Sequence, residues 1–261
     1  RGTAPRHRAR SRLHQTCVCL PLRANQVGLG RLGACFGHGW ANEVRPGAIY
    51  HVTVTAPLPR VALPVDRSDF SRAGDVLGRA FHDDPQWVWL MPDPAVRKVK
   101  LPVMFTGATK MATVAGGRAD RSPGFEAIAL WIAPGRDIGL WAFLRSSSTS
   151  ARWILTPPVP DIRRMNGVMR SFDGRRKELM PEPHWYLMAL GTDPQHQGHG
   201  FGSALVRAGL QRAERDGTPV YLETESEINV PFYQRLGFEV IEEMTLPQFD
   251  APFSLMIRRP V

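Results

Sequence analysis

A glycine-rich stretch that follows an apolar run constrains the fold of this chain more than any other feature. The run HWYLMALGT ends at Thr192, and the segment DPQHQGHGFGSALVRAG follows it directly. A near-continuous apolar run is typical of a central strand buried on both faces. Apolar residues then recur at the spacing of one helix face: Phe201, Ala204, Leu205 and Ala208. The sequence therefore predicts a strand, a tight turn and a helix that Gly217 can end.

The turn itself carries glycines at three alternate positions, Gly198, Gly200 and Gly202. Without Cβ atoms, the backbone N–H groups of such a turn can converge, and the following helix N-terminus adds partial positive charge. Convergent donors of this kind suit a pyrophosphate. A tight turn between a strand and a helix can also need glycine for close packing alone, so a structural role stays open. A Walker loop needs a lysine here, and a dinucleotide motif needs G-x-G-x-x-G; this turn offers neither.

The N-terminal half of the chain predicts alternating strands and helices. A first strand is expected around Val61–Val65, and Ser68 or Asp69 can cap a helix that Pro85 stops. The segment AVRKVKLPVMFTGATKMATVA predicts a second helix, with Pro102 near a kink or boundary. The segment FEAIALWIAP predicts another strand.

The C-terminal half continues this alternation, which makes the whole an α/β unit. A helix is expected over Asp161–Met180, and VYLETES predicts a strand after the helix that follows the glycine turn. Asn229 can cap a short helix that Gly237 ends. The segments FEVIEEMTL and FSLMIRRP predict a final pair of strands.

The positive charge of the chain is concentrated in its first 60 residues. These hold nine of the 33 basic residues and one of the 24 acidic ones, while the whole chain has a net charge of +9. Residues 1–51 lack helical or strand periodicity, so we expect a basic, disordered extension there and one domain over 52–261. The near-neutral domain offers no basic groove, which argues against a nucleic-acid partner. No apolar stretch approaches the ~18 residues of a membrane span, so we expect no membrane partner.

The three cysteines, Cys17, Cys19 and Cys35, all lie in the basic extension. The domain therefore uses neither a disulfide framework nor a cysteine nucleophile, which argues against an acetyl-cysteine intermediate. The pair in CVC has no partner pair at zinc spacing, so we expect no metal site. This cysteine usage suits a reducing cytoplasm.

From Trp185 onward the chain resembles the GNAT superfamily of N-acetyltransferases. The resemblance rests on DPQHQGHGFGSAL followed, about 30 residues later, by NVPFYQRLGF. It is weaker over AFHDDP and ALWIAPG, is absent from the basic extension, and covers roughly residues 61–261. It implies a mixed α/β fold: a central, mostly antiparallel twisted sheet with a parallel, splayed strand pair, flanked by helices.

The resemblance also implies acetyl-CoA as co-substrate and a set of residues that bind it. The N–H groups expected at its pyrophosphate belong to Gln197, Gly198, His199, Gly200, Phe201, Gly202 and Ser203. The strand end formed by Leu190, Gly191 and Thr192 is expected to pair with the pantetheine arm and to polarise the thioester carbonyl. Asn229 is expected to contact the coenzyme.

Acetyl transfer to an amine needs a proton for the departing thiolate and a group that accepts the proton of the amine. Tyr233 is our candidate general acid, since an ordinary tyrosine pKa of ~10 keeps it protonated at neutral pH. Core packing within PFYQRLGF is its alternative role. Glu223 is our candidate base, acting through water, and a solvated or ion-paired strand residue is its alternative. Glu225 and His184 compete with Glu223 for the role.

The acceptor is expected to be the primary amine of a small molecule, antibiotics included, attacked directly in a ternary complex. Asp83, Asp84, Trp87 and Trp89 can attract a cationic amine and stack on a ring, and Trp131 is a similar case. A helix-end acidic pair followed by core tryptophans is the alternative. A protein or peptide amine, and a non-catalytic acyl-CoA sensor, remain alternative functions. The enzyme is expected to be a monomer or homodimer.

Overall fold

The computed structural model describes residues 61–136, 162–225, 228–246 and 249–261. Contacts divide the chain at Pro57, and the fold described here belongs to the second unit, Leu58–Val261. The predicted basic extension, its boundary at residue 51 and its three cysteines lie outside the described residues. Among those described, no helix is long and apolar enough to cross a membrane.

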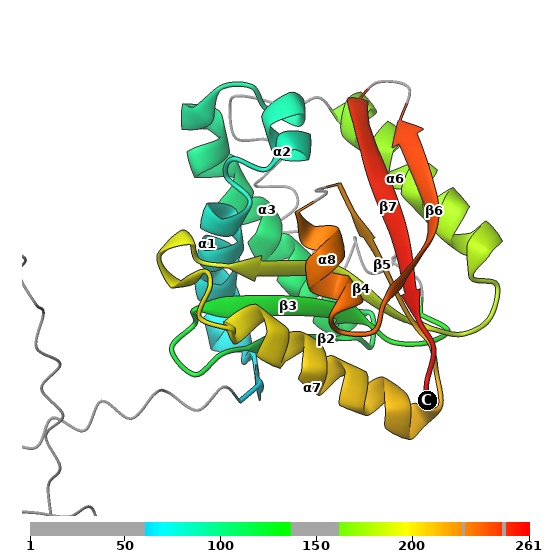
Figure 1. Ribbon diagram of the computed structural model, residues 1–261. Coiled ribbons are helices and arrows are strands. Elements are labelled where there is room, and N and C mark those ends of the chain that lie inside the picture. The colour runs from blue at the N-terminus through cyan, green and yellow to red at the C-terminus, as the bar shows by residue number, and fades with distance from the viewer. Residues whose placement is uncertain (1–60, 137–161, 226–227, 247–248) are drawn as a thin grey trace, which may run out of the picture. The chain divides into compact units, whose positions relative to one another are not determined.

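Helices and strands alternate along the chain as the sequence predicts, with two additions (Figure 1). In order, the elements are β1 (Leu63–Pro64), α1 (Phe70–Ala80), α2 (Pro85–Leu90), α3 (Pro94–Val114), β2 (Arg118–Arg121), β3 (Ala127–Ile132), α6 (Ile162–Leu179), β4 (Trp185–Thr192), α7 (Phe201–Asp216), β5 (Val220–Thr224), α8 (Asn229–Gln234), β6 (Glu239–Leu246) and β7 (Phe249–Arg258). Short 3-10 turns at Arg67–Asp69 and Pro194–His196 precede α1 and α7.

The described strands form one sheet in the order β1-β2-β3-β4-β5-β7-β6. Neighbouring strands are antiparallel except β4 and β5, which are parallel. The ladder between β4 and β5 consists of two pairs, Trp185 with Val220 and Tyr186 with Tyr221. Beyond these pairs β5 rises away from β4 (Figure 1). The sheet is therefore mostly antiparallel with a splayed parallel pair at its centre, and the predicted fold class is confirmed.

Alternation along the strands builds a core on each face of this sheet. On one face, Ala129 and Trp131 of β3 and Leu222 of β5 pack in the same apolar cluster as α7 and α8. On the other, Ile128 and Leu130 of β3 pack in a cluster with α1 and α3. Farther along this second face, Tyr221 of β5 lies in a cluster with residues of α6. Side chains on β4 and β5 therefore face either α7 and α8, or α1, α3 and α6.

The two additions, α2 and β2, differ from the sequence predictions for physical reasons. Pro85 was expected only to stop the first helix, but it also occupies the first turn of α2, where its missing N–H costs nothing. The strand Arg118–Arg121 reads RADR and carries no apolar alternation, so its pattern did not reveal it. Pro102 lies inside α3, which continues past it to Val114.

The expected burial of β4 on both faces is only partly correct. Leu187 and Gly191 are buried, whereas the other β4 side chains are partly exposed. A central strand pairs along both edges in an ordinary sheet, but the splay opens the β5 edge of β4 beyond Tyr186. The partial exposure of the apolar run thus follows from the splay.

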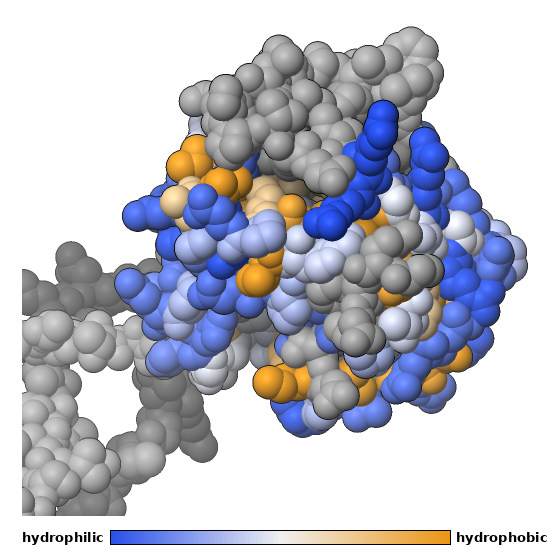
Figure 2. Space-filling model, turned by 90° about the horizontal axis from the view of Figure 1, so that it is seen from above, coloured by the Kyte–Doolittle hydropathy of each residue, from blue (hydrophilic) through white to orange (hydrophobic). Residues whose placement is uncertain are grey.

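The outer edge of the sheet is charged rather than apolar. Along β6, residues alternate between exposed and partly buried, with Glu239 and Glu243 exposed. Hydrophilic side chains dominate the right-hand side of Figure 2. The rotation between the two figures keeps left and right, and α6 and β6 lie on the right-hand side of Figure 1. Charges on an edge strand disfavour pairing with another chain.

Gly209 lets α7 approach β3, and its replacement should destabilise the fold. A Cβ at this position would lie 2.1 Å from Trp131 Cζ2, on a ring that is fully buried. We expect Gly209→Ala to lower the free energy of unfolding by about 1–3 kcal/mol, measured by denaturant titration with circular dichroism. Gly174→Ala on α6 is the matched control, because its Cβ would meet nothing within 4 Å. Equal losses in both variants would contradict the packing argument.

Candidate active site

The glycine-rich turn is anchored at the end of β4 by Asp193. The Asp193 carboxylate accepts hydrogen bonds from Arg79 Nε at 2.8 Å and from the backbone N–H of Gln195 at 3.1 Å. The backbone N–H of Asp193 donates to the carbonyl of Glu126 at 2.8 Å. Because Arg79 belongs to α1 and Glu126 precedes β3, the turn is held from two sides.

The turn needs glycine at two positions for its conformation. Gly198 and Gly200 have φ angles of +77° and +81°, a region that side chains with a Cβ disfavour. At Gly202 the constraint is contact, since a Cβ there would lie 3.1 Å from Thr192 Oγ1 at the end of β4. The two segments predicted to bind the coenzyme, residues 190–192 and 197–203, are thus brought together.

The first turn of α7 presents backbone donors without side-chain caps. The N–H groups of Phe201, Gly202 and Ser203 precede the first intrahelical bond, in which the N–H of Ala204 donates to the carbonyl of Gly200 at 3.1 Å. Gly200 is the N-cap and has no side chain with which to accept them. These donors, together with the positive end of a 16-residue helix, can hold an anion.

The polar side chains of the turn bond back to the turn itself. The Ser203 hydroxyl donates to the carbonyl of Gly200 at 2.9 Å, and Gln197 Nε2 donates to the carbonyl of Thr192 at 3.4 Å. His199 Nδ1 lies 2.9 Å from the carbonyl of Gln197. These side chains thus stabilise the turn, and the binding of an anion by its backbone N–H groups stays a prediction.

Tyr233 on α8 is buried on the α7 face of the sheet, in one apolar cluster with Leu187 of β4 and Leu222 of β5. Its ring packs edge-on against Phe232 and Phe238, with centroids 5.0 and 5.7 Å away. Burial raises the pKa of Tyr233 above its ordinary value, so the hydroxyl stays protonated over the working range of an enzyme. This environment is compatible with both the acid role and the packing role.

Asn229 does not cap α8, so that expectation was wrong. Ile228 occupies the N-cap position, and Asn229 is the first helical residue. Its Nδ2 donates instead to Thr224 Oγ1 at 3.2 Å, at the end of β5. The amide therefore bonds to the end of β5 instead of the first turn of its own helix. The contact holds Asn229 beside the splayed strands.

Glu223 lies on β5 with its side chain on the face opposite to Tyr233. It follows Tyr221 by two residues and therefore shares that residue's face, which α6 covers. Burial raises the pKa of Glu223 to about 7, although the hydroxyls of Tyr186 and Tyr221 and the charge of Arg176 oppose this rise. Glu223 Oε1 is buried and has no hydrogen-bond partner among the described residues. A buried carboxyl that titrates near neutral pH suits a general base.

Comparison with known proteins agrees with this geometry. Residues 163–238, from the first turn of α6 to the residue before β6, match the family described as "Acetyltransferase (GNAT) family". An uncharacterized N-acetyltransferase of Schizosaccharomyces pombe is 26% identical over 204 residues, which are 75% of this chain and 82% of that protein. An acetyltransferase structure from Corynebacterium glutamicum, titled "histone acetyltransferase HPA2 and related acetyltransferase", is 28% identical, with a TM-score of 0.52 over 77% of this chain and 96% of that one. This chain is an N-acetyltransferase with the GNAT fold.

A second, shorter similarity covers about a quarter of this chain. A mycothiol acetyltransferase of Nocardiopsis dassonvillei is 35% identical over 77 residues, which are 27% of this chain and only 23% of that protein. The GNAT family implies an acyl-CoA co-substrate. The glycine turn fits its pyrophosphate, because Gly198 and Gly200 hold the backbone in a conformation that leaves the donors of α7 uncapped. No group of His, Cys, Asp and Glu that can hold a metal ion occurs in the described part of this N-acetyltransferase.

Replacing Gly200 with alanine should weaken acyl-CoA binding. A Cβ strains the left-handed conformation at φ +81° and shifts the donors of the first turn of α7. We expect the Kd for CoA, measured by isothermal titration calorimetry, to rise about tenfold, a loss of ~1.4 kcal/mol. Gly217→Ala is the matched control, since Gly217 caps the other end of α7 with φ +61°. An unchanged Kd for Gly200→Ala would make the turn purely structural.

Asp84 and Glu225 form a partly buried acidic pair that their separate positions in the sequence did not reveal. Desolvation raises the pKa of both carboxyls, to about 10 for Glu225, where the neighbouring Asp84 adds to the rise. Like charges this close cannot both ionise, so the pair holds a proton at neutral pH. Glu225 is therefore a poorer base than Glu223 in the N-acetyltransferase. Burial lowers the pKa of His184, the third candidate, which contacts Arg176 and Tyr221.

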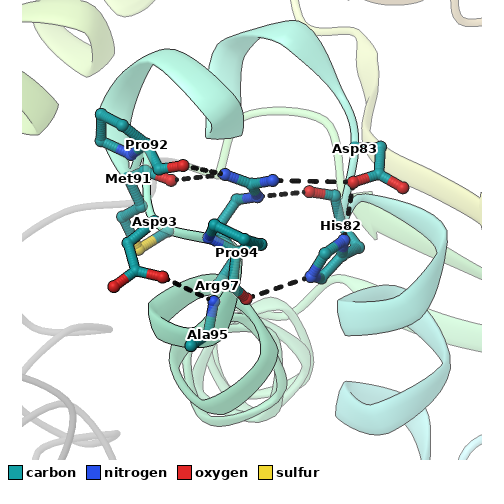
Figure 3. A network of polar contacts seen from close by, with 8 residues as sticks. All are labelled: His82, Asp83, Met91, Pro92, Asp93, Pro94, Ala95 and Arg97. Atoms are coloured by element: carbon teal, nitrogen blue, oxygen red, sulfur yellow. Dashed lines mark hydrogen bonds and ion pairs between the residues drawn. The ribbon is translucent and has the colours of Figure 1, made fainter.

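Asp83, by contrast, points outward and belongs to a structural network (Figure 3). Its side chain is 85% exposed and lies 2.7 Å from His82 Nδ1 and 3.6 Å from the buried Arg97. Arg97 donates to the carbonyls of His82, Met91 and Pro92 at 2.6, 2.8 and 2.8 Å. One guanidinium thus ties together the segments before and after α2 and fixes the N-terminus of α2, where Asp84 lies.

The tryptophans expected near the acceptor are mostly core residues. Trp131 is fully buried on the α7 face, and a role at the acceptor is wrong because the ring fills the space against Gly209. Trp87 packs edge-on against Phe105 at 5.7 Å and is also buried. Trp89 is partly buried, with the Arg164 guanidinium 5.0 Å from its ring. Trp87 and Trp131 are therefore core residues, which is the alternative role that the sequence left open for them.

The sequence reasoning missed the partners of Glu223. Tyr186, Tyr221 and Arg176 come from β4, β5 and α6, and each affects its carboxyl. The period of two along β5 relates Tyr221 to Glu223, and that signal was available. The position of Arg176 depends on how α6 packs, for which the sequence alone offered no signal.

Proposed function

We propose that this N-acetyltransferase transfers the acetyl group of acetyl-CoA to the primary amine of a small molecule, by direct attack in a ternary complex. The observation that carries the proposal is the placement of Glu223 and Tyr233 on opposite faces of the sheet, at the strands that splay apart. A thioester held between β4 and β5 would have a base on one side and an acid on the other.

The proposed reaction transfers two protons, forms one C–N bond and breaks one C–S bond. The Glu223 carboxylate takes a proton from the amine through a water molecule, and the amine nitrogen attacks the thioester carbonyl carbon. Backbone N–H groups at the end of β4, residues 190–192, stabilise the negative charge on the carbonyl oxygen. The C–S bond then breaks, and the sulfur receives the proton of Tyr233.

The coenzyme is proposed to lie along the turn and α8. The N–H groups of residues 197–203 bind the pyrophosphate, which the positive φ angles and uncapped donors of the turn support. Asn229 contacts the coenzyme from the start of α8, and its hydrogen bond to Thr224 supports a position beside the splay.

The acceptor is proposed to be a small amine, with antibiotic aminonucleosides as one class. The segments WYLMALGTDPQHQGHGFGSAL and NVPFYQRLGFEV resemble puromycin N-acetyltransferase. The carboxyls of Asp84, Glu223 and Glu225 support a basic acceptor, since they lie on or beside one strand. A protein amine is the second candidate, because a structure 28% identical to this chain is titled a histone acetyltransferase.

The test is thiol release from acetyl-CoA by the full chain, with separate pools of aminonucleosides, aminoglycosides, polyamines, amino acids and short peptides. Release with one small-molecule pool, confirmed as an N-acetylated product by mass spectrometry, supports the proposal. Release with peptides alone would favour the second candidate. Tight acetyl-CoA binding without release from any pool would contradict a small-amine acceptor of these classes.

A further inference from the structure

A buried arginine lies behind the proposed base, on the helix that covers its face. Arg176 belongs to α6 and is 7% exposed. Its Nη2 donates to Asp173 Oδ1 at 2.6 Å, and its Nη1 lies 3.3 Å from His184 Nε2. Its Cζ lies 5.0 Å from the centroid of the Tyr186 ring. A buried guanidinium is thus held by a carboxylate, an imidazole and an aromatic ring.

Two tyrosines connect this arginine to Glu223. Tyr186 and Tyr221 face each other across the short β4–β5 ladder, with ring centroids 5.9 Å apart. Glu223 lies two residues farther along β5 on the same face as Tyr221. Burial and, after it, the charge of this carboxyl raise the pKa of both tyrosines. The Tyr221 hydroxyl oxygen is buried and has no hydrogen-bond partner among the described residues. The cluster is therefore continuous from α6 to the point where the strands splay.

In the described cluster that runs from Arg176 through Tyr186 and Tyr221 to Glu223, the positive charge belongs to Arg176. Glu225 follows the end of β5 and Asp84 is the N-cap of α2, and burial raises the pKa of both, so this pair holds a proton at neutral pH. Burial keeps both tyrosines protonated and lowers the pKa of His184, so these groups are neutral. The other charges beside the cluster are paired: Glu242 of β6 with Arg175, and Asp173 with Lys177 as well as with Arg176.

We propose that Arg176 is a positioning residue that orients Glu223 and favours its ionised form, through its charge and through the tyrosine that it covers. The inference rests on the proposed function, in which Glu223 is the base. Burial raises the pKa of Glu223 and the charge of Arg176 lowers it. Without Arg176 this pKa would therefore be higher, and Glu223 would stay protonated to higher pH. The charge on α6 would thus set the pH range over which the amine can be deprotonated.

Direct titration of Glu223 tests the inference without any acceptor. In the full chain labelled with ¹³C at the glutamate carboxyls, Glu223→Gln identifies the resonance, and its midpoint is followed by NMR. We expect Arg176→Gln to raise the midpoint by about one pH unit, and Arg176→Lys to keep it near the wild-type value. Arg170→Gln, at an exposed position of the same helix, is the matched control and should leave it unchanged.

A second variant covers the case in which Arg176→Gln does not fold. Asp173 is 42% exposed, so Asp173→Asn should be tolerated. It removes a negative charge beside Arg176, which His184 and Tyr186 still hold, so the Glu223 midpoint should fall. An unchanged midpoint in folded Arg176→Gln, or in Asp173→Asn where the first variant is unfolded, overturns the inference.

Kinetics separate this inference from the proposed function. With an acceptor in hand, the acidic limb of the kcat/KM profile should move with the NMR midpoint in each Arg176 variant, while the high-pH plateau stays. A lower plateau with an unmoved limb would mean a merely structural role and overturn the inference. If Glu223→Gln keeps the wild-type limb, Glu223 is not the base and the proposed mechanism fails, whereas the NMR titration still judges the effect of Arg176.

Discussion

Replacing Glu223 with glutamine should slow acetyl transfer at pH 7 by about 10²-fold or more. Glutamine keeps the size of the side chain but cannot accept a proton from the amine. Since burial raises the pKa of Glu223 to about 7, wild-type kcat/KM should rise with pH through this value, and the variant should lose this limb. Acetyl-CoA affinity should stay nearly unchanged. The measurement is the pH dependence of kcat/KM together with the Kd for acetyl-CoA.

The same substitution should stabilise the fold at high pH. A carboxyl whose pKa is higher in the folded than in the unfolded chain favours folding while protonated and loses this stabilisation as pH rises through the folded value. Glu223→Gln should therefore unfold at a higher temperature than the wild type at pH 8. Glu239→Gln, on the exposed edge strand, is the control and should change neither rate nor Tm. A Glu223→Gln enzyme with a wild-type rate and limb would assign the base to another group.

The sequence predicted best those features whose causes are local. The strand, turn and helix from Trp185 to Asp216 follow from an apolar run, glycines at fixed positions and a helical apolar stripe. Gly200 and Gly217 then occupy the two left-handed positions that bound α7. Each of these signals lies within a few residues of the structure that it determines, so a single sequence is sufficient to read it.

The environment of the site could not be predicted in the same way. The burial of Glu223 depends on α6, and the protonation of Glu225 depends on Asp84, which comes from a distant part of the chain. Asn229 shows the same limit on a smaller scale, because the nearby end of β5 offers its amide a partner in place of the helix. Local propensity cannot rank such contacts, since tertiary packing decides which groups meet and which are desolvated.

Replacing Tyr233 with phenylalanine should cut turnover by about 10²-fold and leave the fold nearly intact. The ring packs between Phe232 and Phe238, and phenylalanine preserves these contacts. Only the hydroxyl is lost, and with it the proton for the departing sulfur. We therefore expect an unchanged Kd for acetyl-CoA, a nearly unchanged Tm, and a fall in kcat and kcat/KM by the same factor, which marks an interaction made in the transition state.

Varying the acidity of the leaving thiol separates an acid role of Tyr233 from a packing role. Because burial raises the pKa of Tyr233, its hydroxyl is a weak acid and helps mainly by donating to a sulfur that already carries negative charge. An acetyl thioester of a more acidic thiol needs less of this help, so the loss in Tyr233→Phe should shrink with such a donor. An equal loss with both donors would indicate that the hydroxyl acts on binding geometry. An unchanged rate with acetyl-CoA would remove Tyr233 from the mechanism and leave it as a core residue of α8.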